Sequence, residues 1–133
     1  MIKNNLFVYG TLLVPAVMEA VTGKKYRSDR ASLTGFARYR IKDQVYPGIT
    51  HDEKRTVDGA VYFDIDPPVL KRLDEFESYV YQRREVEIGL QDELDIRAWV
   101  YVVADEYKHL LSYQGWDIEE FKLKHLNLYL KQI

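Results

Sequence analysis

The sequence contains no cysteine among its 133 residues. This absence excludes disulfide bonds, thiolate metal sites and a cysteine nucleophile. The three histidines, His51, His109 and His125, also lie far apart, and none has a partner at metal-ligand spacing. We therefore expect no metal site in this protein.

Long apolar runs are missing as well. The first run, Leu6–Tyr9, is too short for a signal peptide, and no later run approaches membrane-spanning length. Together with the absence of cysteine, this pattern is typical of a soluble cytoplasmic protein. We therefore expect a cytoplasmic location and no membrane partner.

Neither sign of charge dominates, because 19 lysines and arginines stand against 21 aspartates and glutamates. The formal net charge is −2, and no basic tract occurs. Nucleic-acid binding relies on clustered basic side chains that neutralise phosphates. The composition therefore predicts no nucleic-acid partner.

Length and composition indicate one globular domain, residues 1–133, with a hydrophobic share of 47% and a charged share of 30%. Several strand-like segments in hairpin-like pairs accompany two or three helical segments, without repeat or linker. We therefore expect an α+β fold with a curled or barrel-like mixed sheet. The expected strands are 6–9, 31–41 with a bend at Gly35, 57–65, 81–90 and 96–103. The expected helices are 15–21, a second that starts after Asp66, and a third that starts after Asp117.

Two segments carry detailed expectations for packing. Alternation along 57–65 predicts Val57, Val61, Phe63 and Ile65 on one face, with Tyr62 on the other. Residues 46–49, Tyr-Pro-Gly-Ile, are typical of a turn between extended pieces.

The last helix is expected to be capped by Asp117. Helical spacing then predicts an apolar stripe that includes Phe121, His125 and Leu128. His125 would be packed in the core on this face.

The segment Leu73–Glu77 places a carboxylate where a helix is expected to be apolar. Asp66 and the two prolines after it predict a helix start, and Leu70 and Leu73 mark the inner face. Glu77 lies seven residues after Leu70 and four after Leu73, so it shares that face. Loss of hydration there raises the pKa of a carboxyl group toward neutral pH. Glu77 is therefore the candidate catalytic base.

A structural role for Glu77 is the alternative. Arg83 and Arg84 follow within seven residues and could pair with it in a half-exposed salt bridge. Ion-pair networks also place carboxylates near protein cores. Spacing alone leaves both interpretations open.

The second candidate feature is a glycine turn, Tyr9–Leu12, at the end of a buried strand. Glycine lets the backbone turn sharply, so successive N–H groups can point into one concavity and bind a carboxylate or an oxyanion. The alternative is an ordinary strand-ending turn, which the motif alone favours. No further glycine pattern of a phosphate-binding loop follows.

Taken together, these segments resemble the γ-glutamylcyclotransferase-like family, and especially its AIG2-like branch. No single motif is specific, but their order and spacing run through most of the chain. The resemblance rests on residues 7–12 (FVYGTL), 46–49 (YPGI), 57–62 (VDGAVY), 73–77 (LDEFE) with 81–83 (YQR), and 116–129. Two departures are Thr11, where many relatives carry serine, and Ser78, where some relatives have glycine.

The resemblance implies a small mixed β-barrel with flanking helices and a C-terminal helix. It implies that Glu77 is the general acid/base, and that a pocket lies between it and the glycine turn. The residues expected to bind substrate or support the pocket are Tyr9, Gly10, Thr11, Leu12, Tyr46, Tyr81 and Arg83.

The activity implied by the resemblance is cyclisation of a γ-glutamyl group to 5-oxoproline with release of an amine. This chemistry needs neither cofactor nor metal, and the expected partner is a small γ-glutamyl amide or amine. A non-catalytic small-ligand-binding or interaction domain of the same fold is the alternative. Cyclisation of a different acyl group would use the same two motifs.

Overall fold

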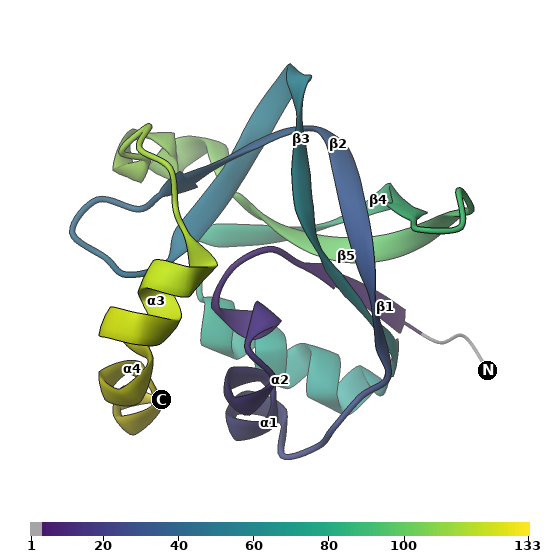
Figure 1. Ribbon diagram of the computed structural model, residues 1–133, viewed down its shortest axis with the longest axis horizontal. Coiled ribbons are helices and arrows are strands. Elements are labelled where there is room, and N and C mark those ends of the chain that lie inside the picture. Colours follow the sequence, from purple (N-terminus) through teal and green to yellow (C-terminus); the bar gives the residue numbers. More distant parts are fainter. Residues whose placement is uncertain (1–3) are drawn as a thin grey trace.

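The computed structural model of the protein describes residues 4–133, which form a closed five-stranded β-barrel with helices packed around it (Figure 1). The strands are β1 (Asn4–Val8), β2 (Ser28–Arg40), β3 (Pro47–Ile65), β4 (Tyr81–Leu90) and β5 (Asp95–Val103). Their order is β1-β3-β2-β4-β5, and a parallel pairing of β1 with β5 closes the barrel. All other neighbouring strands are antiparallel. The expected α+β fold with a barrel-like mixed sheet is confirmed.

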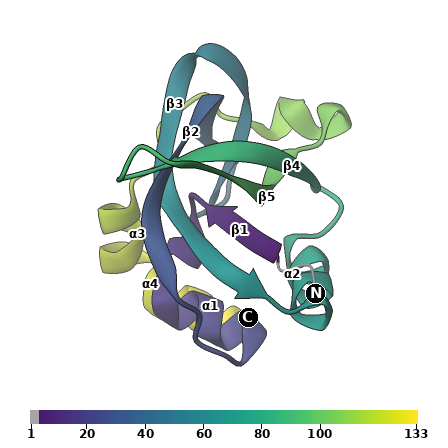
Figure 2. The same cartoon turned by 90° about the vertical axis from the view of Figure 1, so that its right-hand side faces the viewer.

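The helices gather outside the barrel, and α1, α2 and α4 lie at the same end of it in both views (Figures 1 and 2). They are α1 (Pro15–Thr22), α2 (Pro67–Glu77), α3 (Ile118–Lys124) and α4 (Leu126–Gln132), with 3-10 helices η1 (Thr11–Leu13) and η2 (Asp105–Leu110). Within residues 4–133, no helix has both the length and the apolar character that a membrane crossing requires.

Two hydrophobic clusters hold these layers together. One consists of strand residues of the barrel, including Phe7, Leu33, Val61, Ile88 and Val100, together with Tyr9 just after β1, and it fills the barrel interior. The other joins the outer faces of the strands to the helices, and its members include Leu6, Val17, Leu70, Leu73 and Phe121. Burial of these side chains on both faces of the wall stabilises the barrel and fixes the helices against it.

The long hairpin of β2 and β3 forms a large part of the barrel wall. A register shift beside Gly35, whose φ is +93°, confirms the expected bend within one continuous strand. The turn of this hairpin occupies residues 42–46, and Pro47 already begins β3. The turn predicted at 46–49 is therefore wrong in position. Gly48 instead lies in the strand, where a Cβ atom would collide with the side chain of Val103.

The end of β3 departs from simple alternation. Val57 and Val61 face the barrel interior with the half-buried Phe63, as predicted. Ile65, however, joins Tyr62 in the cluster beneath the helices, so the predicted face of Ile65 is wrong. The cause is an irregularity in the β1–β3 pairing next to Asp64, whose φ is +59°. One extra residue in a strand reverses the faces of the side chains beyond it.

The C-terminal helix forms but breaks into α3 and α4 at His125, whose φ and ψ are −126° and −21°. Asp117 caps α3 as predicted, because its carboxylate accepts the N–H of Glu119 at 2.8 Å. The break changes the helical phase. Leu128, predicted on the inner stripe, is therefore 63% exposed, and His125 is half-buried rather than packed in the core.

The contact of β3 with β1 provides a first prediction. In Gly59→Ala, the new Cβ atom would collide with the backbone oxygen of Val8, one residue before the glycine turn. We expect a loss of unfolding free energy of about 2–3 kcal/mol, because neither backbone can move without breaking the pairing. Urea denaturation measures this change. Gly89→Ala in β4 is the matched control, since its Cβ would meet its nearest neighbours at 3.4 and 3.7 Å. A wild-type midpoint for Gly59→Ala would contradict the prediction.

Candidate active site

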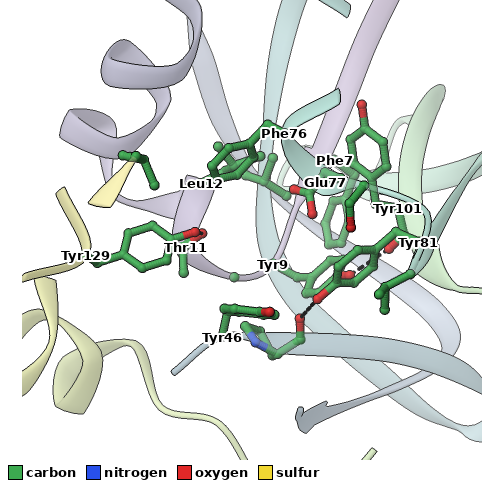
Figure 3. A pocket seen from close by; sticks show the side chains of 16 residues that line it. Phe7, Tyr9, Thr11, Leu12, Tyr46, Phe76, Glu77, Tyr81, Tyr101 and Tyr129 are labelled. Carbon is green, nitrogen blue, oxygen red and sulfur yellow. Dashed lines mark hydrogen bonds between the residues drawn. The ribbon is translucent and has the colours of Figure 1, made fainter. Parts of the chain in front are cut away.

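A cavity of about 250 Å³ lies between the end of β1, the end of α2 and the C-terminal helices (Figure 3). It brings together seven of the eight residues that the sequence singled out. These are Tyr9, Gly10, Thr11, Leu12, Tyr46, Glu77 and Tyr81. Residues that lie far apart in the sequence therefore meet around one cavity.

The local structure of α2 explains how Glu77 reaches this cavity. Leu70 and Leu73 are buried on the inner face of the helix, and Glu77 continues that face at its last residue. The prolines start the helix as expected, but Asp66 does not cap it with its side chain. Its carboxylate instead accepts a hydrogen bond from Lys24 Nζ at 2.8 Å.

The carboxyl group of Glu77 forms neither a hydrogen bond nor an ion pair with any group of residues 4–133. Arg83 pairs with Asp74 through two bonds of 2.8 and 3.2 Å, and Arg84 binds Gln82 at 3.0 Å. The salt bridge considered for Glu77 therefore does not form. Glu77 is half-buried in the wall of the cavity, and the loss of hydration raises the pKa of its carboxyl group to about 8.

Several tyrosine phenols surround the carboxyl group of Glu77 (Figure 3). Burial, followed by the negative charge of Glu77, raises the pKa of Tyr9 well above its ordinary value and also raises the pKa of Tyr46. The Tyr9 hydroxyl donates to the backbone oxygen of Tyr101 at 2.6 Å, and the Tyr81 hydroxyl donates to that of Pro47 at 2.7 Å. The phenols therefore stay neutral near pH 8 and are fixed in place. Among the described lining residues, Glu77 alone carries a carboxyl or basic side chain.

The glycine turn faces the same cavity. Its chain continues into η1, where the N–H of Leu13 binds the oxygen of Gly10 at 2.9 Å. Within the described chain, the N–H groups of Gly10, Thr11 and Leu12 donate no hydrogen bond to another residue. Unpaired N–H groups at the start of a 3-10 turn are suited to bind an anion. The turn therefore has the donors that the sequence suggested.

The position of the glycine turn is fixed from two sides. Arg38 Nη1 donates to the backbone oxygen of Tyr9 at 2.8 Å. A Cβ atom at Gly10 would lie 2.9 Å from the ring of Pro47, which is too close. Glycine is therefore required because the backbone at residue 10 packs closely against Pro47, and not because of its φ, which is negative. These contacts hold the N–H groups in place without a ligand.

Arg83 is the one predicted residue outside the cavity lining. Its guanidinium holds Asp74 and lies 4.3 Å from the ring centroid of Trp99. Asp74 in turn accepts the hydroxyl of Tyr101, which does line the cavity, at 2.7 Å. Arg83 is therefore placed to support the wall through Asp74 and Tyr101 rather than to touch a ligand.

Tyr101 and Tyr129 are lining residues that the sequence did not reveal. Tyr101 lies in β5, within the strand expected at 96–103, but no sequence pattern showed that its side chain points to the cavity. Tyr129 comes from α4, and its hydroxyl lies 3.2 Å from Thr11 Oγ1. The helix break at His125 decides where Tyr129 points, and no sequence pattern marked that break.

Within residues 4–133, no group of three histidine, aspartate or glutamate side chains is placed to hold an ion. The arrangement instead combines one proton-transfer group with an anion-binding turn and neutral aromatic walls. It is suited to chemistry on a small molecule that carries both an amine and a carboxylate.

Comparison with known proteins confirms the resemblance described above. A family model, Gamma-glutamyl cyclotransferase, AIG2-like, matches residues 6–118. AIG2-like protein D of Arabidopsis thaliana is 35% identical over 130 residues, which cover 96% of this chain and 85% of that protein.

Solved structures agree with this match. A solution structure from Arabidopsis thaliana superposes with a TM-score of 0.77 at 27% identity, covering 99% of this chain and 80% of that one. A solved gamma-glutamyl cyclotransferase shares 18% identity and a TM-score of 0.67, covering 98% of this chain and 86% of that one, and thus shares the fold. The chain belongs to the gamma-glutamyl cyclotransferase, AIG2-like family.

Proposed function

We propose that this protein cyclises the γ-glutamyl group of a small amide to 5-oxoproline and releases an amine. The observation that carries the proposal is the unpaired carboxylate of Glu77 in a cavity that also contains the unpaired N–H groups of residues 10–12. Family membership and the shared barrel support the same activity.

In the proposed reaction, Glu77 in its ionised form takes a proton from the substrate's α-ammonium group. The free amine then attacks the γ-carbonyl carbon, and a five-membered ring closes. As the C–N bond to the leaving group breaks, Glu77 gives this proton to the departing nitrogen. The carboxylate, ionised again, then takes the second proton that the ring nitrogen still carries after the attack and passes it to the released amine, which leaves as an ammonium ion. No water is consumed, and the products are 5-oxoproline and the free amine.

The glycine turn holds the reacting half of the substrate in this proposal. The N–H groups of Gly10, Thr11 and Leu12 bind the α-carboxylate or the oxyanion that develops on the γ-carbonyl. Attack by the substrate's amine on its own γ-carbonyl is fast once the bound substrate is held in a folded conformation. Effective molarities on the order of 10⁵ M or more are known for well-oriented reactions of this kind. Positioning by the turn therefore supplies much of the rate acceleration.

The neutral phenols leave Glu77 as the group that exchanges protons near physiological pH. Tyr9 and Tyr81 donate their hydroxyl protons to backbone oxygens, and burial raises the pKa of both. They therefore act as fixed walls rather than as competing acids.

The pH dependence of turnover provides a second prediction. Because the pKa of Glu77 is about 8, only about a tenth of the free enzyme is ionised at pH 7. We expect kcat/KM to rise with pH along an acid limb centred near 8. In the complex, the ammonium group of the bound substrate stabilises the Glu77 carboxylate. The acid limb of the kcat profile should therefore lie at lower pH than that of the kcat/KM profile. A profile flat from pH 6 to 9 would contradict the assignment of Glu77 as the base.

The proposed activity is tested by a panel of γ-glutamyl compounds, with 5-oxoproline and glutamate quantified separately. Cyclisation predicts 5-oxoproline and free amine in equal amounts, whereas hydrolysis would give glutamate. A protein that releases neither product, yet is stabilised thermally by 5-oxoproline, would instead be a binding domain. The panel should include glutathione, γ-glutamyl amino acids and γ-glutamyl-lysine, which share the reacting half and differ in the leaving amine.

A further inference from the structure

Ser78 has a backbone conformation that is unusual for any residue with a side chain. It follows Glu77 directly as the C-terminal cap of α2, and its φ and ψ are +68° and −174°. Glycine adopts this region readily, whereas other residues are strained there because of their Cβ atom. Strained residues of this kind cluster at active sites and ligand clamps.

The Ser78 side chain makes no compensating contact in the fold. The residue is exposed, and its hydroxyl forms no hydrogen bond with any residue from 4 to 133. Only the backbone forms hydrogen bonds: its N–H donates to the oxygen of Asp74 at 3.1 Å, and its oxygen accepts the N–H of Tyr81 at 3.4 Å. A glycine would keep those backbone bonds and remove the strain, so the fold itself gives no reason for serine.

The cavity gives such a reason, because Ser78 is one of the residues that line it. Among the lining residues, Thr11 and Leu12 of the glycine turn are only 6% and 4% exposed, so we infer that this turn lies at the inner end of the cavity. Ser78 is exposed and therefore lies at the mouth. A substrate whose glutamyl half sits on the inner turn would extend its amine half past Ser78.

We propose that the Ser78 hydroxyl is a substrate-contact group that hydrogen-bonds the amine half of the γ-glutamyl compound at the cavity mouth. This inference rests on the proposed function for the orientation of the substrate. It assigns the two ends of the cavity to the two halves of the substrate. It also explains why a strained serine occupies a position suited to glycine.

Two variants separate the hydroxyl from the backbone. Ser78→Ala removes the hydroxyl but keeps the Cβ atom and the strain, whereas Ser78→Gly removes both. With γ-glutamyl butylamide as substrate, we expect kcat/KM to fall by about three- to tenfold in both variants, the effect of one lost hydrogen bond. Binding of 5-oxoproline, which lacks the amine half, should stay unchanged in both.

Thermal unfolding tests the strain independently of activity. Ser78→Gly should melt about 2–5 °C above the wild type, because relief of strain exceeds the added flexibility of the unfolded chain. Ser78→Ala should melt within about 1 °C of the wild type. Equal kcat/KM in all three proteins, or a lower melting temperature for Ser78→Gly than for Ser78→Ala, would overturn the inference.

A binding measurement keeps this test separate from the proposed function. Glu77→Gln protein cannot turn over the ligand, so its affinity for γ-glutamyl butylamide is measured with and without Ser78→Ala. A three- to tenfold weaker affinity with Ser78→Ala supports the contact, including in the case that the wild type releases no 5-oxoproline. Unchanged affinity overturns the contact, including in the case that the wild type is an active cyclotransferase.

Discussion

Glu77→Gln is expected to lower kcat for 5-oxoproline release by about 10²–10⁴-fold, the usual contribution of a general acid/base. Glutamine has nearly the shape of glutamate but no basic site at physiological pH. The carboxylate has no hydrogen-bond partner within residues 4–133, so its replacement breaks no contact of the fold. The loss should therefore be one of chemistry and not of structure.

Glu75→Gln is the matched control for this experiment. Glu75 lies two residues earlier on α2 and is exposed, so Glu75→Gln makes the same chemical substitution on the same helix but away from the cavity. We expect wild-type kcat for Glu75→Gln and unchanged circular dichroism for both variants. A folded Glu77→Gln protein with normal kcat would show that the carboxylate is structural.

The same substitution should stabilise the protein at alkaline pH. Burial raises the pKa of Glu77 from 4.5 in the unfolded chain to about 8 in the fold. Between these values the folded protein keeps a proton that the unfolded chain releases, so stability from this group falls as pH rises from about 4.5 to 8. Below that window the group is protonated in both states and has no effect. Glutamine does not titrate, and its contribution stays constant.

The size of this effect follows from the same shift. The full pKa shift of Glu77 corresponds to about 5 kcal/mol of unfolding free energy. Water that reaches Glu77 through the cavity weakens the effect, so we expect Glu77→Gln and the wild type to differ by roughly 2–3 kcal/mol in unfolding free energy. We therefore expect Glu77→Gln to unfold at higher urea concentration than the wild type at pH 8, and at the same concentration at pH 4.5. A stability difference independent of pH would contradict the raised pKa. Glu75→Gln again supplies the control, since it should show no such trend.

The features that local spacing controls could be predicted from the sequence. The helix that starts after Asp66 sets Glu77 on the face of Leu70 and Leu73, because residues four and seven apart share a helix face. The strand that ends before Gly10 could also be predicted from neighbouring residues alone, because a short apolar run precedes that glycine. Both candidate features therefore emerged from the sequence, although only the folded chain shows that they share one cavity.

The partner of Arg83 could not be predicted in this way. Asp74 and Glu77 are one helical turn apart, and both lie within reach of an arginine that follows the helix. The approach of β4 to α2 decides between them, and it places Arg83 against Asp74. Because Arg83 pairs with Asp74, the carboxyl group of Glu77 has no ion-pair partner. The raised pKa of Glu77 therefore depends on tertiary packing.

Irregular backbone accounts for the other differences. The irregularity at Asp64 turns Ile65 toward the helices, and the break at His125 brings Tyr129 to the cavity. Neither position has a glycine or a proline to mark it. Periodicity therefore predicted that these strands and helices exist, but not all of their bounds and not the faces beyond each interruption.

The most direct test of the central claim is a side-by-side assay of wild type and Glu77→Gln at pH 8, with 5-oxoproline, glutamate and free amine quantified in the same samples. We expect the wild type to form 5-oxoproline and amine in equal amounts without glutamate. We expect Glu77→Gln, folded and able to bind 5-oxoproline, to form almost none. Equal 5-oxoproline formation by the two proteins, or glutamate as the product, would contradict the account.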